Sequence, residues 1–150
     1  MAERFPRVAL GLRAGAADRA LRLLVGRFGI PVAGVWILRT SGRRSGRVHE
    51  VPVIPVALDG AEHLVAPRGS TDWMRNLVAA GHGELRRGRT CRAVSAEPLG
   101  EEERVPVLCA YITANRRLNG RFFDVPGEAT TDDVRRIARR HPVVRLRPGG

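Results

Sequence analysis

Residues 48–66, VHEVPVIPVALDGAEHLVA, contain the strongest fold signal of the chain. Two runs rich in β-branched and other apolar residues, 48–58 and 62–66, flank the dipeptide Asp59-Gly60. An Asp-Gly pair between two such runs predicts a tight β-hairpin, because its turn needs a positive φ at both positions. The first run contains two prolines, which lack the N–H that a central strand donates, so it belongs at a sheet edge or a bulge. The stretch therefore predicts paired antiparallel strands.

The flanking sequence extends this antiparallel pattern. Further strands are expected at 35–38, 83–96 (a second hairpin turning at 87–89) and 141–146, and helices at 7–28, 73–80, 101–117 and from Thr130 or Thr131 to Arg140. Consecutive hairpins without βαβ alternation or a G-x-G-x-x-G motif argue against a Rossmann fold. We expect an α+β fold whose antiparallel sheet closes into a small barrel with helices outside. The 150 residues fit one domain, 1–150, with the barrel over about 35–146.

The chain is strongly basic. Its formal net charge is +11, and all 26 residues counted as Lys plus Arg are arginines. Codon bias in a GC-rich genome and selection for bidentate binding of phosphates and carboxylates both explain this choice. A nucleic-acid-binding protein is disfavoured, because the arginines are spread along the chain and no helix-turn-helix, zinc-finger or RNP pattern appears.

No apolar run approaches the roughly 20 residues that span a bilayer, and the N-terminus lacks the layout of a signal peptide. Cys91 and Cys109 have no zinc-binding spacing, so we expect free thiols in a reducing cytoplasm and no metal site. The basic amphipathic helix expected at 7–28 is able to rest on anionic lipid, although packing against the core explains it better. Cytoplasmic localisation is expected, with peripheral membrane contact as the alternative.

Two turns combine glycine with arginine. In residues 40–47, TSGRRSGR, glycines expose backbone N–H groups among three arginines and two serines, which suits an anion. The alternative is a basic hairpin tip in solvent. Residues 66–73, APRGSTDW, leave a strand and enter a helix N-terminus, which also attracts anions. Asn76 lies one helical step after Trp73, so both face the same way. Because a meander brings both turns to one region of the sheet, we expect them to serve one anionic ligand.

The stretch LRTSGRRSGRVHEVPV (38–53), the Asp-Gly hairpin and VAPRGSTDWMRNL (65–77) together resemble the deazaflavin-dependent nitroreductase family of actinobacteria. The family pattern is a Thr-rich strand end, a GR-basic-Ser/Thr-G turn, a proline in the next strand, and a small-residue, basic-Gly loop that enters a helix with Trp and Asn. The resemblance is strong over about 35–80 and weak over the rest.

The resemblance implies an antiparallel split β-barrel of the FMN-binding type that transfers a hydride from reduced coenzyme F420 to a small quinone, enone or nitro compound. The phosphate and polyglutamate tail would lie on Arg43, Arg44, Ser45, Gly46, Arg47 and His49. The groove and the loop near the ring would comprise Pro52, Ile54, Ala66, Pro67, Arg68 and Gly69, supported by Trp73 and Asn76. No catalytic side chain is assigned, because hydride chemistry belongs to the cofactor.

The sequence departs from the family on the substrate side. Pro67 replaces a serine, Ile54 stands where a tyrosine can occur, and the loop from Arg68 to Trp73 is a few residues shorter. Asn115, Leu118 and Arg121 fall roughly where other members carry tyrosines. The candidates for the substrate wall are Tyr111, Asn115, Phe122 and Phe123, with simple packing as the alternative for each.

Three other functions remain open at this point. The barrel is able to bind FMN in place of F420, or to carry F420 without catalysis, and a nucleic-acid-binding role is the weakest. The physiological electron acceptor and the choice between monomer and homodimer are not determined by these patterns.

Overall fold

The computed structural model describes residues 34–149, and the helix predicted over 7–28 lies outside the described residues. The strands are β1 (Trp36–Ser41), β2 (Val48–Val53), β3 (Val56–Leu58), β4 (Ala61–Val65), β5 (His82–Arg87), β6 (Thr90–Pro98) and β7 (Val143–Pro148). The helices are α2 (Asp72–Ala80), α3 (Glu101–Asn119), α4 (Thr131–Ile137) and the short 3-10 helices η3 (Gly120–Phe122) and η4 (Ala138–Arg140). Within residues 34–149, no helix is long and apolar enough to cross a bilayer.

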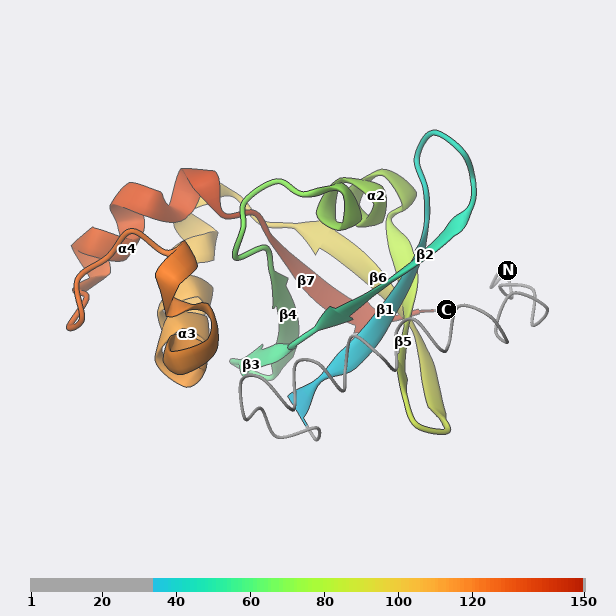
Figure 1. Ribbon diagram of the computed structural model, residues 1–150, viewed down its shortest axis with the longest axis horizontal. Helices are drawn as coiled ribbons and strands as arrows, with labels where there is room; N and C mark the ends of the chain where they lie inside the picture. The colour runs from blue at the N-terminus through green and yellow to red at the C-terminus, as the bar shows by residue number, and fades with distance from the viewer. Residues whose placement is uncertain (1–33, 150) are drawn as a thin grey trace.

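The seven strands form one antiparallel sheet in the order β2-β1-β5-β6-β7-β4-β3 (Figure 1). The single strand predicted over 48–58 is wrong: it is divided into β2 and β3. Pro55 has no N–H to donate and restricts the backbone of Ile54 before it, so regular pairing stops there. The two halves then form opposite edges of the sheet. The edge position predicted from the prolines is confirmed, and the curled sheet with two open edges is the predicted split barrel.

The predicted hairpins are present. Asp59 and Gly60 have φ values of 51° and 76°, and Leu58 lies opposite Ala61 in an antiparallel pair. Two consecutive positive φ values are those of a tight turn matching the twist of its strands. The second hairpin joins β5 to β6 around Gly88, which also has a positive φ.

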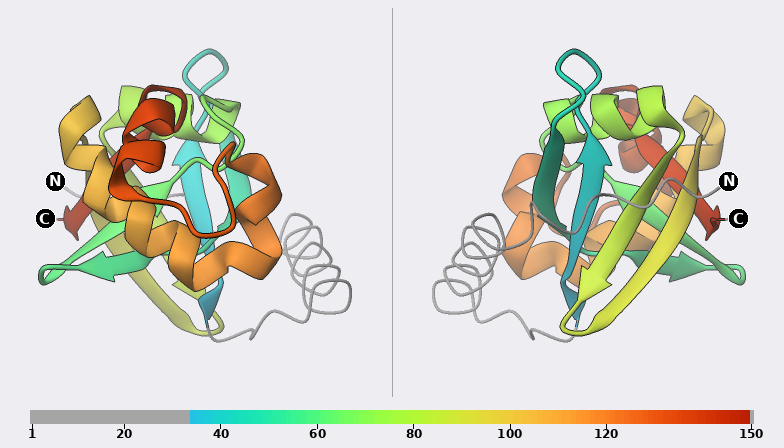
Figure 2. Two further views of the ribbon diagram at one scale, coloured as in Figure 1. Left: turned by 90° about the vertical axis from the view of Figure 1, so that its left-hand side faces the viewer. Right: turned by 90° about the vertical axis from the view of Figure 1, so that its right-hand side faces the viewer.

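Two apolar cores lie on the two faces of the sheet. Neighbouring residues of one strand point to opposite faces, and Leu64 accordingly belongs to the inner core whereas Val65 belongs to the outer one. The inner core includes Met74 and Leu77 of α2, which lies over one end of the curled sheet. The outer core packs α3 and α4 against β3, β4 and β7, and Figure 2 shows these helices together on one side.

Local signals set the ends of the helices. Gly81 ends α2 in the left-handed conformation, and its N–H donates to the carbonyl of Leu77. Thr130 begins α4 with a reciprocal capping pair to Asp133. Helix α3 runs two residues beyond the predicted end and is interrupted at Asn115, whose backbone is not helical. The final strand begins at Val143 and not at His141, because His141 still follows the last turn of η4.

Candidate functional site

The turn between β1 and β2 is closed by its own backbone. Gly42 donates its N–H to the carbonyl of Arg47 (2.7 Å), and Gly46 donates to the carbonyl of Gly42 (2.9 Å). The N–H of Arg47 donates to Ser45 Oγ at 3.2 Å. Among the described residues, the N–H groups of Arg44 and Ser45 have no acceptor. The turn therefore presents two free backbone donors.

Arg43 attaches this turn to helix α2. Its N–H and its Nη1 both donate to Asn76 Oδ1, at 3.2 and 2.8 Å, and its Nη2 lies 3.0 Å from Asp72 Oδ1. Asn76 is buried, so its amide oxygen fixes the position of the turn. The hydrogen bond from Arg43 lowers the pKa of Asp72, and the charge of Arg43 adds to this effect. The carboxylate of Asp72 is therefore charged at neutral pH.

The turn, β2 and α2 enclose a cavity of about 360 Å³, here called the turn cavity. It is lined by residues 42–45, residues 49–51, Asp72, Trp73 and Asn76. In Figures 1 and 2 the turn projects beyond the sheet at the end where α2 lies. A Cβ on Gly42 would lie 2.8 Å from Nε2 of the exposed His49, so a larger residue at this position requires the His49 side chain to move.

The charges in the turn cavity leave one arginine available. Glu50 forms a buried ion pair with Arg39 (3.1 Å), and Asp72 is paired with Arg43. Arg44 makes no hydrogen bond or ion pair with any residue in the described range. Its guanidinium and the two free N–H groups point to an anion as the ligand.

The second Gly-and-Arg loop, residues 66–70, packs differently. Ala66 is fully buried, and its carbonyl accepts from Gly69 N (3.1 Å) and lies 3.3 Å from His141 Nδ1. Gly69 has a φ of 84°, and an added Cβ would lie 3.1 Å from the carbonyl oxygen of Arg140. The guanidinium of Arg68 lies 4.8 Å from the ring centroid of Phe122. Arg68 is thus directed towards the end of α3 and not towards Arg44.

The predicted cofactor residues therefore fall into two groups. Those around the turn cavity are Arg43, Arg44, Ser45, His49, Trp73 and Asn76. Gly46 and Arg47 belong to the turn but do not line the cavity. Pro52 lies on β2, opposite Ile37 of β1, and Ile54 packs against the outer core. Ala66, Pro67, Arg68 and Gly69 form the second loop. Arg68 and Asp72 are four positions apart, and such a segment spans at most about 14 Å. The two groups are therefore close together in the chain, although Arg68 itself points to Phe122.

Two of the four predicted substrate-wall residues are parts of the outer core. Tyr111 and Phe123 are 3% and 4% exposed and meet edge to face with centroids 6.0 Å apart. Packing accounts for both, so they offer almost no surface to a substrate. Phe122 is half-buried and contacts the guanidiniums of Arg68 and Arg121, whereas Asn115 donates to the carbonyl of Tyr111 at 3.1 Å.

The sequence patterns did not identify several residues of the turn cavity. Glu50, Val51 and Asp72 line it, and Thr71 Oγ1 at the start of α2 is buried with no hydrogen-bond partner among residues 34–149. Asp72 stands at the first position of the helix, where an acidic residue is usually explained by the helix dipole alone. Its pairing with Arg43 depends on a contact between distant segments.

Comparison with known proteins identifies the family. The model of the F420H2-dependent quinone reductase family matches residues 15–117. No curated protein sequence matches the chain. Among solved structures, the F420H2-dependent reductase FDR-A has a TM-score of 0.53 at 19% identity, covering 76% of this chain and 94% of its own.

Two further structures share the fold. The conserved hypothetical protein Rv2991 from Mycobacterium tuberculosis has a TM-score of 0.52 at 18% identity, over 91% of this chain and 80% of its own. A Listeria innocua protein assigned as a pyridoxamine 5′-phosphate oxidase has a TM-score of 0.52 at 10% identity, over 90% and 94%. The sheet order and these likenesses show a split β-barrel, and the family that the chain matches uses F420H2. The chain belongs to the F420H2-dependent quinone reductase family and is an oxidoreductase.

Proposed function

We propose that this chain holds the anionic tail of F420H2 at the β1–β2 turn and catalyses hydride transfer to a quinone. The observation that carries the proposal is the set of donors above the turn cavity: the guanidinium of Arg44 and the free N–H groups of Arg44 and Ser45. Charge-assisted hydrogen bonds to phosphate and carboxylate oxygens are the strong ones in proteins. A polyanionic tail is the matching ligand.

The residues present fit this cofactor. The turn offers the guanidinium of Arg44 and the free backbone N–H groups of Arg44 and Ser45. Helix α2 also directs its N-terminal N–H groups to this end of the molecule. The negative charge of Asp72 repels an anion only in part, because Asp72 forms an ion pair with Arg43 at 3.0 Å.

The loop 66–69 is the expected contact for the ring of the cofactor. Its backbone is held by His141 and by the close approach of Gly69 to Arg140, so it is positioned before a ligand arrives. Trp73 gives the turn cavity an aromatic wall. When bound, F420H2 supplies the hydride, and the quinone takes this hydride and one proton to leave as the hydroquinone.

The protein's own contribution is binding, orientation and exclusion of water. We assign no proton donor, and solvent is sufficient for the one proton that the hydroquinone takes in addition to the hydride. Transfer needs the acceptor at near-attack distance, and a misplacement of about 1 Å can cost about 100-fold. With Tyr111 buried and Pro67 unable to donate an N–H, bulky nitroimidazoles are expected to be poor acceptors.

The test is a steady-state assay of the full chain with F420H2 and a panel of quinones, enones and nitroimidazoles. We expect turnover of quinones, and slower turnover of nitroimidazoles. Gel filtration after incubation with oxidised F420 or with FMN gives an independent readout of the cofactor. Tight binding of F420 without turnover of any acceptor would contradict the enzymatic function and indicate that the protein is a carrier of F420.

We also propose that the protein is cytoplasmic. Cys91 is exposed and Cys109 partly buried, and both are free thiols, as suits a reducing cytoplasm. Burial raises the pKa of the Cys109 thiol, which keeps it protonated and unreactive. Contact with a membrane surface through residues 7–28, and the choice between monomer and homodimer, are to be tested by vesicle sedimentation and by light scattering.

A further inference from the structure

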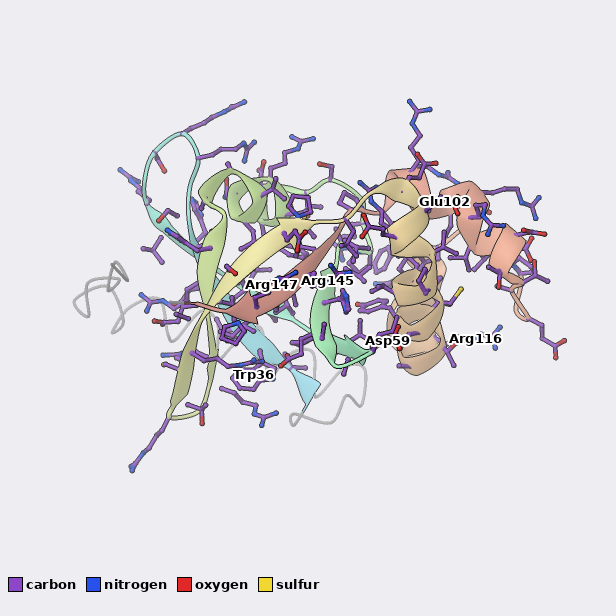
Figure 3. The ribbon with its side chains drawn as sticks, turned by 180° about the vertical axis from the view of Figure 1, so that it is seen from behind. Trp36, Asp59, Glu102, Arg116, Arg145 and Arg147 are labelled. Carbon is purple, nitrogen blue, oxygen red and sulfur yellow. The ribbon has the colours of Figure 1, made fainter. Side chains whose placement is uncertain are left out.

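A second cavity of about 600 Å³ lies away from the turn cavity, and the two share no lining residue. It is bounded by the β3–β4 hairpin (58–63), the end of β7 (145–148) and the first half of α3. Figure 3 shows Arg145 and Arg147 over β7, with Asp59 at the hairpin beside α3. We call it the hairpin cavity. Its volume is within the range of about 300–1,000 Å³ typical of small-molecule sites.

Two arginines of the hairpin cavity are already neutralised. Arg92 holds Glu62 with two contacts of 2.7 and 2.8 Å, a bidentate geometry. Arg147 donates to Glu97 at 3.3 Å. Neither guanidinium needs a ligand to balance its charge.

Arg145 differs from both in geometry. It forms ion pairs with Glu97 at 3.8 Å and Glu103 at 3.9 Å, and both separations are too long for hydrogen bonds. Within residues 34–149 its side chain makes no hydrogen bond, and it is about one-third exposed at the cavity wall. It therefore has planar donors available for an oxyanion.

His63 adds a second polar group at the same place. It lies opposite Arg145 in the β4–β7 register and lines the cavity, although only 3% of its surface is exposed. Its Nδ1 is buried with no partner in the described part of the chain. Burial lowers the pKa of His63, so the ring is neutral at pH 7 and is not a second cation. A buried ring nitrogen without a partner is costly, and a ligand would satisfy it.

The remaining walls decide the class of ligand. Leu58, Val94, Pro106 and Val107 give the cavity apolar surface. The three lining arginines are matched by three lining acids, Asp59, Glu62 and Glu103. These carboxylates repel a dianion such as phosphate more strongly than a monoanion, so a monoanion on Arg145 is the favoured class of ligand.

We propose that the hairpin cavity binds a small organic carboxylate, with its carboxylate on Arg145, a polar contact to His63 Nδ1 and its hydrocarbon part on the apolar walls. This site is independent of the F420 site proposed above. It gives the protein a second ligand, with a different chemistry from the polyanionic tail at the turn.

Benzoate is the probe, with benzamide as its neutral analogue and inorganic phosphate as the dianion-forming comparison. In nitrogen-15 correlation spectra of the full chain, benzoate should saturably shift the amides of 58–63 and 145–147 and leave those of 42–47 in place. Benzamide should bind at least about tenfold more weakly, because charge-assisted bonds are lost. Phosphate should also bind more weakly than benzoate.

Arg145→Gln should weaken benzoate binding by at least about tenfold, and Arg89→Gln, the same charge change at the exposed β5–β6 turn, should leave it unchanged. Both variants should bind F420 with the same affinity. The test of the carboxylate site in the hairpin cavity is therefore separate from the test of the F420 site at the turn. Equal affinity for benzoate and benzamide in the wild-type chain overturns the proposal, even if Arg145→Gln does not fold. Unsaturable shifts spread over exposed arginines, or unchanged affinity in folded Arg145→Gln, overturn it as well.

Discussion

The β1–β2 turn and the loop 66–70 contain the same residue types but present them in opposite ways. In the turn, Arg44 and two backbone N–H groups are free, and only Arg43 is attached to another element. In the loop, the arginine stacks on Phe122 and Gly69 closely approaches the chain at Arg140. The turn is built to receive a charged ligand, whereas the loop is already held by the protein.

The difference shows that glycine and arginine do not define an anion site by themselves. What matters is whether an acceptor or an aromatic ring of the same chain is within reach. Arg68 has Phe122, and Arg43 has Asn76 and Asp72. Arg44 has neither among the described residues.

The largest expected effect comes from removing the cations of the turn. The double variant Arg43→Ala with Arg44→Ala should weaken F420 binding by about tenfold or more, since Arg44 loses a charge-assisted bond of about 1.5–3 kcal/mol and the turn loses the side chain that attaches it to α2. The salt dependence of binding should also become flatter. Fluorescence titration at several salt concentrations measures both.

The single variants separate binding from folding. Arg44→Ala should lose affinity while its free energy of unfolding stays within about 0.5 kcal/mol of wild type. Arg43→Ala should also lose about 1 kcal/mol of stability, because buried Asn76 loses a donor. Arg89→Ala, at an exposed turn elsewhere, is the matched control. If the double variant bound F420 with wild-type affinity, the turn would be only a basic hairpin tip with no role in binding.

Two glycine substitutions, one in the turn and one in the loop, test which segment tolerates an added side chain less well. Gly46→Ala should cost about 1–2 kcal/mol of unfolding free energy, because only its φ of 68° opposes a side chain. Gly69→Ala should cost about 2–3 kcal/mol, because the new Cβ also lies 3.1 Å from the Arg140 carbonyl. Urea denaturation with unchanged m-values gives the comparison. Equal losses would mean that the contact with Arg140 relaxes without cost.

Arg68→Ala should have a smaller effect. Loss of its stacking on Phe122 should lower the unfolding free energy by about 0.5–1 kcal/mol. F420 affinity should change much less than in Arg44→Ala, because this arginine is engaged within the protein. An affinity loss as large as that of Arg44→Ala would show that Arg68 leaves Phe122 for the cofactor.

The smallest expected effect is a pH dependence of the free energy of unfolding, caused by His141, which contacts the loop 66–70. Burial lowers the pKa of His141 below its ordinary value of 6.5, and the carbonyl of Ala66 opposes this only in part. The unfolded chain then binds a proton more readily than the folded one, so stability is full above about pH 6.5 and falls on acidification. Urea midpoints between pH 7.5 and 5.5 should decrease, and His141→Gln should flatten the curve.

Some slope should remain in His141→Gln, since burial also lowers the pKa of His63. His82→Gln, on β5, is the control and should follow the wild-type curve. A wild-type midpoint that rises on acidification would contradict the assignment of a buried neutral His141.

The sequence alone determined the features that depend on a few neighbouring residues. The Asp59-Gly60 hairpin, the end of α2 at Gly81 and the closed turn around Gly42 follow from local backbone requirements. The motif around the turn was also sufficient to indicate the family, because it combines these local signals at fixed spacing.

Only the tertiary structure decided how distant segments meet. It divided 48–58 between the two edges of the sheet, buried Tyr111 and Phe123, and turned Arg68 towards Phe122. The Arg43–Asn76 contact joins residues 33 positions apart. The same arginine side chain is compatible with solvent, with a ligand or with a neighbouring ring, and only the packing of the whole chain determines which of these lies within its reach.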